Sequence, residues 1–436
     1  MPAMPAADHA RPDLVVRPFR GVRYDAALVS DLASVTSPPY DVIDPDSAAH
    51  LEDLDPHNVV RLILPRDGPT GGPDRYAQAR SAMDEWTAEG VLRRDPEPAL
   101  YVYEQVAPGV LQRGLLAAVG LADPQEGVIL PHEDVMAGPV ADRLELMRAT
   151  SANLEPILLV YEGGGDAARV IDEVVDRRAA GAPVVATCTE DGLEQRVWAV
   201  TDPALQERVA RDLAPRQALI ADGHHRYATY RRLQAEHHGR GDGPGDWDLG
   251  LAMLVDSSSH PPRVQAIHRV VAGLPLTEAL ERAATAFRTR PAGGDLATAL
   301  ATLDAATARH PFVLTDGRTF ELIEDPDRDA VDAALPADEH SAQWRSLDAS
   351  VLHALVLRSL WQVDDDGERT AYLHEADAAV RTAVRGHGVA VLMRPVTVEV
   401  VLALAARGER MPRKSTSFGP KPRTGLVLRL VEPRQP

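Results

Sequence analysis

Short apolar stretches typical of strands alternate along this chain with stretches of helical periodicity, and no regular strand–helix–strand rhythm connects them. A regular rhythm would predict a doubly wound parallel sheet, whereas this irregular order favours mixed sheets. We therefore expect an α+β fold in which helices flank mixed β-sheets. Because 436 residues exceed what one hydrophobic core usually holds, we expect two or three domains.

The composition along the chain suggests where these domains divide. Residues 1–12 are expected to form a flexible tail, and residues 13–274 a catalytic region. Residues 275–410 are rich in alanine, leucine and acidic side chains and are expected to form an accessory α+β lobe. Residues 411–436 carry a basic segment and a terminal strand, which we expect to return to the active site.

Charge and hydropathy narrow the classes of function. The formal net charge of -19 disfavours nucleic acid and anionic membranes as partners, but it leaves room for one basic pocket that captures a small anion. No run of eighteen apolar residues would span a membrane, and the first residues do not resemble a signal peptide, so we expect a cytoplasmic protein. Cys188, the only cysteine, excludes internal disulfides and is expected to be a small core residue.

Only two lysines occur among 46 basic residues, and both lie in the segment 411–423, Met-Pro-Arg-Lys-Ser-Thr-Ser-Phe-Gly-Pro-Lys-Pro-Arg. Lysine is a compact point charge, whereas arginine is a planar fork, and phosphate is a common reason to keep the point charge. An ordinary basic loop is the alternative. A Walker loop is excluded because arginine stands where its glycine is required. The expected phosphate-binding residues here are Arg413, Lys414, Ser415, Thr416 and Lys421.

The sequence Ile220-Ala-Asp-Gly-His-His-Arg-Tyr227 predicts a strand, a tight turn at Gly223 and a helix from about His224. The free N–H groups and the dipole of a helix start favour anions, and His224, His225 and Arg226 add donors. Asp222 would ligate Mg²⁺ or accept a proton. In the alternative interpretation, Asp222 only caps the helix and the histidines make core hydrogen bonds.

Two further segments carry polar residues between prolines or glycines. His132 and Glu133 lie on such a loop, where Glu133 is a candidate general base, and Arg143 on the following helix is expected to reach an anion. A solvated acidic loop is the alternative. In Ser-Pro-Pro-Tyr-Asp-Val-Ile, the paired prolines stiffen the backbone and would present Tyr40 and Asp41 in a fixed pose. A stiffened turn without a function is the alternative.

Together these motifs resemble one family, known as domain of unknown function (DUF) 1015. SPPYDVI, NVVRLIL, LPHED, ADRLELMRATSANLEPILLVY, ADGHHRY, AIHRVV and MPRKSTSFGPK occur here in the family's order, over roughly residues 14–430. We expect NVVRLIL, residues 58–64, to be a strand. Residues 275–390 match least. The family name implies no activity.

A second resemblance does imply one. Residues 218–230 are similar to the strand–turn–helix element of the ParB/sulfiredoxin-like fold, in which a Gly-x-x-Arg turn holds nucleotide phosphates. The resemblance implies that Gly223 and Arg226 contact phosphate, with His224 and His225 beside them. That fold includes ATP- or ADP-dependent kinases of free serine, in which a carboxylate activates the hydroxyl, and chromosome-partitioning nucleotide-binding proteins.

These observations lead us to expect an ATP- or ADP-dependent phosphotransferase that uses Mg²⁺ and acts on a small hydroxyl metabolite, with free L-serine as the best guess. Its partners would be the nucleotide and a small-molecule substrate, and a homodimer is left open. Two alternatives remain: a ParB-like nucleotide switch that acts through a protein partner, and a hydrolase of phosphorylated metabolites. The expected catalytic residues are Asp41, Glu133, Asp222, His224 and His225, with Tyr40 and His132 contacting the substrate.

Overall fold

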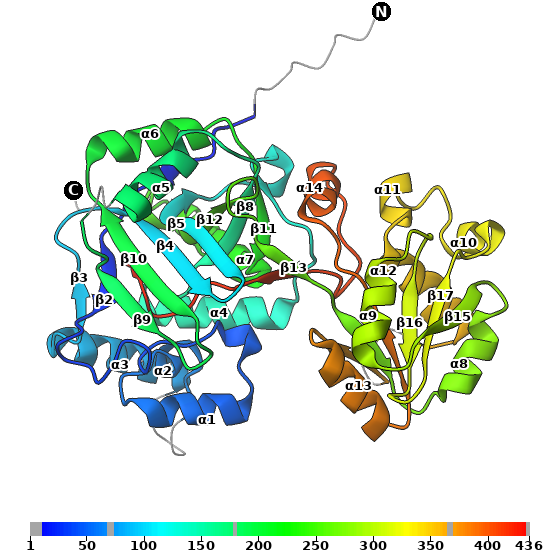
Figure 1. Ribbon diagram of the computed structural model, residues 1–436. Helices are drawn as coiled ribbons and strands as arrows, with labels where there is room; N and C mark the ends of the chain where they lie inside the picture. Colours follow the sequence, from blue (N-terminus) through cyan, green and yellow to red (C-terminus); the bar gives the residue numbers. More distant parts are fainter. Residues whose placement is uncertain (1–10, 68–73, 178–180, 364–368, 433–436) are drawn as a thin grey trace, which may run out of the picture. The chain divides into compact units, whose positions relative to one another are not determined.

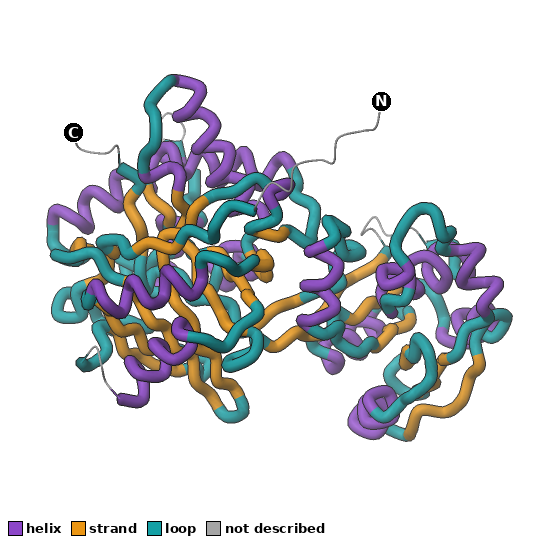
Figure 2. The backbone as a smooth tube through the Cα atoms, turned by 90° about the horizontal axis from the view of Figure 1, so that it is seen from above, coloured by secondary structure: helices purple, strands orange, loops and turns teal. Residues whose placement is uncertain are grey.

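The computed structural model describes residues 11–67, 74–177, 181–363 and 369–432, which form two compact units. Unit 1 comprises the described residues up to 262 together with those from 420, and unit 2 comprises residues 263–419. In both units, helices flank the strands (Figures 1 and 2). The α+β fold with mixed sheets is therefore confirmed. Most of the expected tail, residues 1–12, lies outside the described residues.

The units divide the chain at 262/263 and 419/420, whereas the sequence placed the divisions at 274/275 and 410/411. Strand pairing explains the difference. Strand β14, His268–Val271, pairs with β18, Thr370–Leu373, and with β19, Val389–Leu392, so unit 2 begins earlier than its composition suggests. Strands β13, Arg263–Gln265, and β20, Ser417–Gly419, form a two-stranded ribbon, so most of the lysine segment belongs to unit 2.

A mixed sheet of nine strands, counted over the described residues, forms the centre of unit 1. In sheet order, the strands are β6 Ile129–Leu130, β11 Ala218–Asp222, β8 Ile157–Tyr161, β12 Leu249–Asp256, β5 Val110–Gly120, β4 Leu100–Ala107, β10 Glu194–Val200 and β9 Val185–Cys188, with β1 Val16–Arg17 beside β5. Strands β6 and β11 pair in parallel, as do β8 and β12, and the remaining pairs are antiparallel. Strands β4 and β5 form a hairpin.

A smaller sheet in unit 1 brings the two ends of the chain together. The C-terminal strand β21, Leu428–Leu430, lies between β2, Gly21–Tyr24, and β7, Ala152–Asn153, and β3, Leu92–Arg94, is on the far side of β2. The helices of unit 1 are η1 Tyr40–Val42, α1 Pro45–Leu54, α2 Val60–Ile63, α3 Arg75–Ala88, η2 Pro124–Glu126, α4 Ala137–Thr150, α5 Asp166–Arg177, α6 Pro203–Leu213, α7 His224–Arg240 and η3 Asp246–Asp248.

Two predictions for unit 1 are wrong. Residues 58–64 contain the short helix α2 and not a strand, because the Asn58 side chain donates to Ser34 O at 2.7 Å while its Oδ1 accepts from Val60 N at 2.9 Å. This local hydrogen bonding turns the chain at the point where the apolar run begins. Cys188 is exposed, since it lies at the end of the edge strand β9.

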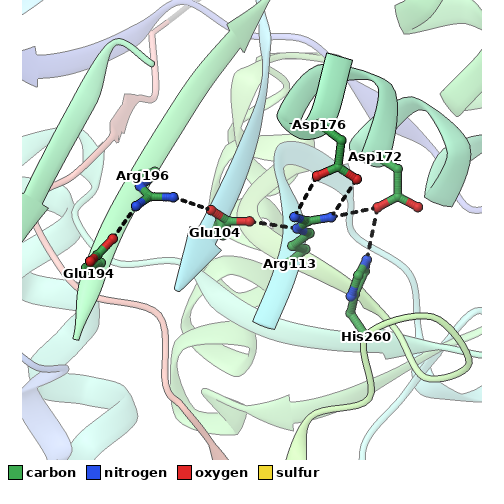
Figure 3. Close-up of polar contacts among 7 residues, drawn as sticks. All are labelled: Glu104, Arg113, Asp172, Asp176, Glu194, Arg196 and His260. Carbon is green, nitrogen blue, oxygen red and sulfur yellow. Dashed lines mark hydrogen bonds and ion pairs between the residues drawn. The ribbon is translucent and has the colours of Figure 1, made fainter. Parts of the chain in front are cut away.

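A network of charged side chains holds α5 against the large sheet (Figure 3). Arg113 of β5 donates from Nε to Glu104 of β4 at 2.7 Å, and its Nη atoms contact Asp172 and Asp176 of α5 at 3.0 and 2.9 Å. Glu104 is 2% exposed and also contacts Arg196 of β10 at 3.3 Å. Because Glu104 is buried between two guanidinium groups, its charge is compensated where water is excluded.

Unit 2 contains a six-stranded antiparallel sheet, counted over the described residues, with a hydrophobic core on each face. This agrees with the α+β lobe expected from the sequence. In sheet order, the strands are β15 Arg288–Gly293, β17 Phe320–Glu324, β16 Phe312–Thr315, β19 Val389–Leu392, β14 and β18 Thr370–Leu373. The helices are α8 Leu276–Ala283, α9 Leu296–Asp304, α10 Arg328–Ala334, α11 Ala342–Arg345, α12 Asp348–Val351, the π-helix η4 Leu352–Leu360, α13 Ala376–Arg385 and α14 Val398–Ala406. None of the helices described in either unit is both long and apolar enough to cross a membrane.

Candidate functional site

The turn between β11 and α7 is the centre of the candidate site. The register between β11 and β8 shifts between Ile220 and Asp222, and a bulge of this kind re-aims the side chains at the strand end. Gly223 follows with φ at 91° as the N-cap of α7. A Cβ at this position would lie 2.9 Å from Ile157 Cγ2 and 3.1 Å from Arg226 Nε, so the turn requires glycine. The predicted strand, turn and helix are thus confirmed.

Helix α7 is held in place by two tyrosines on its buried face. Tyr227 Oη donates to Ala122 O at 2.8 Å, and Tyr230 Oη donates to Glu155 O at 2.8 Å. Both rings belong to the main core of unit 1. The first turn of α7 therefore has a fixed position relative to the sheet.

Asp222 bridges two cations. Its Oδ1 lies 2.7 Å from Lys421 Nζ, and its Oδ2 lies 2.5 Å from Arg226 Nη2. Burial would raise the pKa of the Asp222 carboxyl, but Arg226 and Lys421 outweigh this effect and hold it below its ordinary value. Asp222 is therefore an ionised carboxylate with both oxygens engaged.

Lys421 connects Asp222 to Asp41, whose Oδ2 lies 3.2 Å from Lys421 Nζ. Burial would lower the pKa of the Lys421 ammonium, but the carboxylates of Asp222 and Asp41 raise it above its ordinary value. Gln105 donates to the Lys421 carbonyl at 3.2 Å and Gln112 to the Pro420 carbonyl at 2.8 Å, which fixes the backbone here. Three motifs that are distant in sequence thus meet in one ion cluster, Asp41, Asp222, Arg226 and Lys421.

Arg226 is almost fully enclosed, with 3% of its surface exposed. Its Nη1 donates to Pro156 O at 2.5 Å, and its Nε has no hydrogen-bond partner among the described residues. Burial would lower the pKa of the guanidinium, but Asp222 and Glu155 raise it. Arg226 therefore lies beside Asp222 and holds its carboxylate in place.

Tyr40 lies between the ion cluster and two further buried charged residues, Arg143 and Glu155. Its backbone N–H donates to Glu155 Oε1 at 2.9 Å, and the Arg143 guanidinium carbon lies 4.5 Å from its ring centroid. Burial raises the pKa of the Tyr40 hydroxyl to about 12, with Arg226 opposing the shift. Tyr40 is therefore neutral at physiological pH.

Glu155 is a site residue that the sequence analysis missed. It is 5% exposed, accepts from Tyr40 N and also contacts Thr424 Oγ1 at 3.3 Å. Burial raises the pKa of its carboxyl, while Arg226 and Arg143 lower it. Its place two residues before the apolar strand β8 is the only mark that Glu155 carries in the sequence, and a single carboxylate there forms no motif.

Arg143 lies in the interior, 7% exposed, with Nη1 donating to Ile63 O at 2.5 Å and Nε donating to Asp142 Oδ2 at 2.9 Å. Asp142 lies inside α4, which begins at Ala137 with Met136 at its N-cap, and it accepts from Tyr76 Oη at 2.9 Å. Arg143 therefore bonds to Ile63 and Asp142, and its contact with the Tyr40 ring connects it to the ion cluster.

His132, Glu133 and His224 form a second group around the same turn. The rings of His132 and His224 meet edge to face with centroids 4.5 Å apart. The backbone N–H of His132 donates to His224 Nε2 at 3.3 Å, so a neutral His224 carries its proton on Nδ1, which lies 4.0 Å from Glu133 Oε2. His225 Nε2 accepts from Met136 N at 3.0 Å. Residues from two predicted motifs therefore adjoin each other here.

The residues do not fit a Mg²⁺ ion at Asp222 in this arrangement. Both carboxylate oxygens are already paired with cations, Oδ1 with Lys421 Nζ and Oδ2 with Arg226 Nη2. Across the described parts of the chain, no group of three or more His, Cys, Asp or Glu side chains is arranged to hold a metal.

The lysine segment belongs to both units, because Lys421 lies in unit 1 and Arg413 to Thr416 lie in unit 2. Arg413 and Lys414 are exposed, whereas Ser415 and Thr416 are each 8% exposed. Lys414 has a φ of 55°, and its carbonyl accepts from Arg269 Nη2 at 2.9 Å. The structure therefore brings Lys421 to Asp222 and fixes the backbone at Lys414 separately, within unit 2.

The family model described as "Protein of unknown function (DUF1015)" matches residues 16–350, and the chain belongs to this family. No curated protein matches the sequence. Among solved structures, the chain is similar to a free serine kinase in complex with AMP, at 15% identity and a TM-score of 0.35, over 70% of this chain and 87% of that chain.

Two other solved structures show similarity of the same order. One is a conserved hypothetical protein from Pyrococcus furiosus, at 14% identity and a TM-score of 0.33, over 70% of this chain and 90% of that chain. The other is SbnI with a C-terminal truncation from Staphylococcus aureus, at 13% identity and a TM-score of 0.36, over 72% of this chain and 87% of that chain. Similarity at this level does not establish a shared activity.

Proposed function

We propose that unit 1 is a nucleotide-dependent phosphotransferase that acts on the hydroxyl group of a small metabolite, with free L-serine as the best candidate. The observation that carries this proposal is the meeting of Asp41, Asp222 and Lys421 in one ion cluster at the start of α7. Burying several charges costs free energy unless they compensate one another, and such clusters often mark functional sites.

In this proposal, Lys421 neutralises charge on the transferring phosphoryl group, since this chemistry depends mostly on positioning and electrostatic stabilisation. Gly223 and the first turn of α7 bind nucleotide phosphates, as the start of a helix favours anions. Arg226 acts as a positioning residue because it holds Asp222, which in turn holds Lys421. Mg²⁺ would be carried by the phosphates of ATP or ADP.

Asp41 is the proposed group that orients the acceptor hydroxyl, since its side chain is 35% exposed while it contacts Lys421. As the hydroxyl oxygen bonds to phosphorus, its proton passes to this carboxylate and the bond to the departing nucleotide breaks. Glu133, beside His224, is the second candidate for this role, and Tyr40 and His132 would contact the substrate. The choice of serine comes from the resemblance of residues 218–230 to free-serine kinases.

We propose separately that the part of the lysine segment in unit 2 binds phosphate. Arg413 and Lys414 are exposed cations there, and Ser415 and Thr416 follow them in the chain. Lysine suits phosphate binding because its ammonium group is a compact point charge.

Transfer of labelled phosphate tests the proposal. The protein is incubated with γ-labelled ATP or β-labelled ADP and with L-serine, L-threonine or glycerol, and products are separated by chromatography. We expect labelled phosphoserine, and none from Asp41→Asn or from reactions without acceptor. Absence of any labelled product, together with absence of nucleotide binding by calorimetry, would overturn the proposal.

The pairing of His132, His224 and Glu133 favours a second candidate, a hydrolase of phosphorylated metabolites. Imidazole and carboxylate groups at this distance can move protons during hydrolysis. Release of inorganic phosphate from O-phosphoserine without added nucleotide would favour this function over transfer.

A further inference from the structure

Unit 2 contains a cavity of about 530 Å³, and every residue that lines it belongs to this unit. Strands β14 and β19 are antiparallel, with Arg269 opposite Val391, so the start of β14 and the residues after β19 lie at the same edge of the sheet. The cavity forms there, and its wall includes residues of α11, α12 and α14 together with Met411 and Ser415. Its volume falls in the range of small-molecule sites, roughly 300–1,000 Å³.

One ion pair lines this cavity. Arg394 Nη2 lies 3.4 Å from Asp348 Oδ2, and Arg394 Nη1 donates to Ala306 O at 3.0 Å. Asp348 Oδ1 in turn lies 2.9 Å from His310 Nδ1. The guanidinium group and the carboxylate therefore compensate each other, and neither of them requires a charged ligand.

Arg269 is the second arginine in the wall, and it is 1% exposed. Its Nη1 donates to Ile267 O, and its Nη2 bonds to Lys414 O at 2.9 Å and to His353 Nε2 at 2.8 Å. Because this guanidinium group is enclosed and bonded to the protein, it offers no counter-ion to a ligand. A charged ligand would lose its hydration here without gaining an ion pair, which costs free energy.

Most of the other lining residues are apolar, and they include Leu347, Met393, Val396, Val400 and Met411. Removal of aliphatic ligand surface from water against such a wall is favourable. The two methionines are unbranched and flexible, so they can adapt to the shape of a bound molecule. The wall therefore suits a ligand with an aliphatic body.

Gln343 of α11 adds a neutral hydrogen-bonding group to the wall. Among the described residues, its side-chain amide has no hydrogen-bond partner. A carboxamide both donates and accepts, so it is complementary to a second amide. We propose that this cavity binds a small uncharged amide with an aliphatic body, whose amide group bonds to the Gln343 side chain. The site lies in unit 2 and is independent of the proposed phosphotransferase chemistry in unit 1.

Calorimetry of the full chain with 4-methylpentanamide tests the proposal. We expect saturable binding of this amide and an affinity at least about tenfold lower for 4-methylpentanoate and for 4-methylpentylamine, because each carries a charge that the wall does not pair. Acetamide, which lacks the aliphatic body, should not bind measurably. Gln343→Leu should weaken binding of 4-methylpentanamide by about tenfold, since a hydrogen bond to the ligand is lost.

Two further variants separate filling of the cavity from a general effect of mutation. Val400→Trp should abolish binding because the larger side chain fills the cavity without changing a charge. Arg381→Gln on α13 should bind as the wild type does, since that side chain is 63% exposed and lies outside the cavity wall. Thermal melting verifies that each variant is folded.

Amide hydrogen exchange locates the binding. With 4-methylpentanamide present, exchange should slow at residues 343–349 and 393–400 and should be unchanged at residues 218–230. The proposal is overturned if 4-methylpentanamide does not bind, if 4-methylpentanoate binds as tightly, or if folded Gln343→Leu and Val400→Trp both bind like the wild type. Protection at residues 218–230 alone would also overturn it.

Discussion

Lys421 Nζ lies 2.7 Å from Asp222 Oδ1, so the C-terminal segment of the chain supplies a cation to the end of strand β11. The pKa of Asp222 is lowered and that of Lys421 is raised, which keeps both groups charged over the physiological range. Asp41 shares the same ammonium group. These contacts bring together three motifs that are distant in the sequence, and they are the basis of the proposed function.

The interior position of Arg226 predicts a large effect on stability. In Arg226→Met, Asp222 and Glu155 lose a cation where water is excluded, and the free energy of unfolding should fall by about 3–5 kcal/mol. Urea denaturation followed by circular dichroism measures this change. Arg231→Met on the same helix is the control, since its partner Asp123 is 46% exposed and the loss should stay below about 1 kcal/mol. Equal effects in the two variants would contradict the positioning role.

Asp222 predicts a specific dependence of stability on pH. Its folded-state pKa lies below the ordinary value of 3.8, so its contribution is present above that value and is lost as the pH falls through the folded pKa. The difference in unfolding free energy between the wild type and Asp222→Asn should be largest near neutral pH and shrink below about pH 4. Urea titrations across this range measure it, and a difference that grows on acidification would reverse the assigned sign.

The charged network of Figure 3 predicts unequal roles for its two central arginines. Arg113→Ala removes the 2.7 Å contact to buried Glu104 and both contacts to α5, and should cost about 2–4 kcal/mol. Arg196→Ala should cost less than about 1 kcal/mol, since the Arg196 side chain is 42% exposed. Guanidinium denaturation of both variants checks the order, and a larger loss in Arg196→Ala would refute it.

Lys414 predicts an effect on phosphate binding without an effect on folding. Lys414→Arg keeps the charge but replaces a compact ammonium with a planar fork, so we expect an unchanged melting temperature and weaker binding of phosphate. Thermal melting and calorimetry with inorganic phosphate are compared on the same preparation. Equal affinity in Lys414→Arg would mean that positive charge alone is sufficient at this position.

The parts of the fold and the site that could be predicted are those with strong local signals. The turn at Gly223 followed from a short apolar strand, a glycine and a helical pattern, and the structure has all three. The short apolar run at residues 58–64 could not be assigned from periodicity, because a buried helical turn and a buried strand look alike at that length. Side-chain bonding by Asn58 decides the outcome.

The bonding partners of the site residues could not be predicted from the sequence, because they come from distant parts of the chain. The sequence marked Arg226 as a phosphate contact, but only the fold shows that Asp222 and Pro156 occupy its guanidinium group. Glu155 was overlooked because a single carboxylate beside an apolar strand carries no motif, yet it binds the backbone of Tyr40. The sequence predicted still less about unit 2, because the residues that line its cavity are scattered over the sequence.

Formation of phosphoserine by the wild type and by Lys421→Met tests the central claim most directly. Mass spectrometry follows the product from L-serine with saturating ATP or ADP, and calorimetry verifies that the variant still binds nucleotide. We predict phosphoserine from the wild type and a rate about 100–1,000-fold lower in Lys421→Met, because the variant lacks the charge that stabilises the transferring phosphoryl group. Equal rates in the two proteins would contradict the assignment of the ion cluster as the site of phosphoryl transfer.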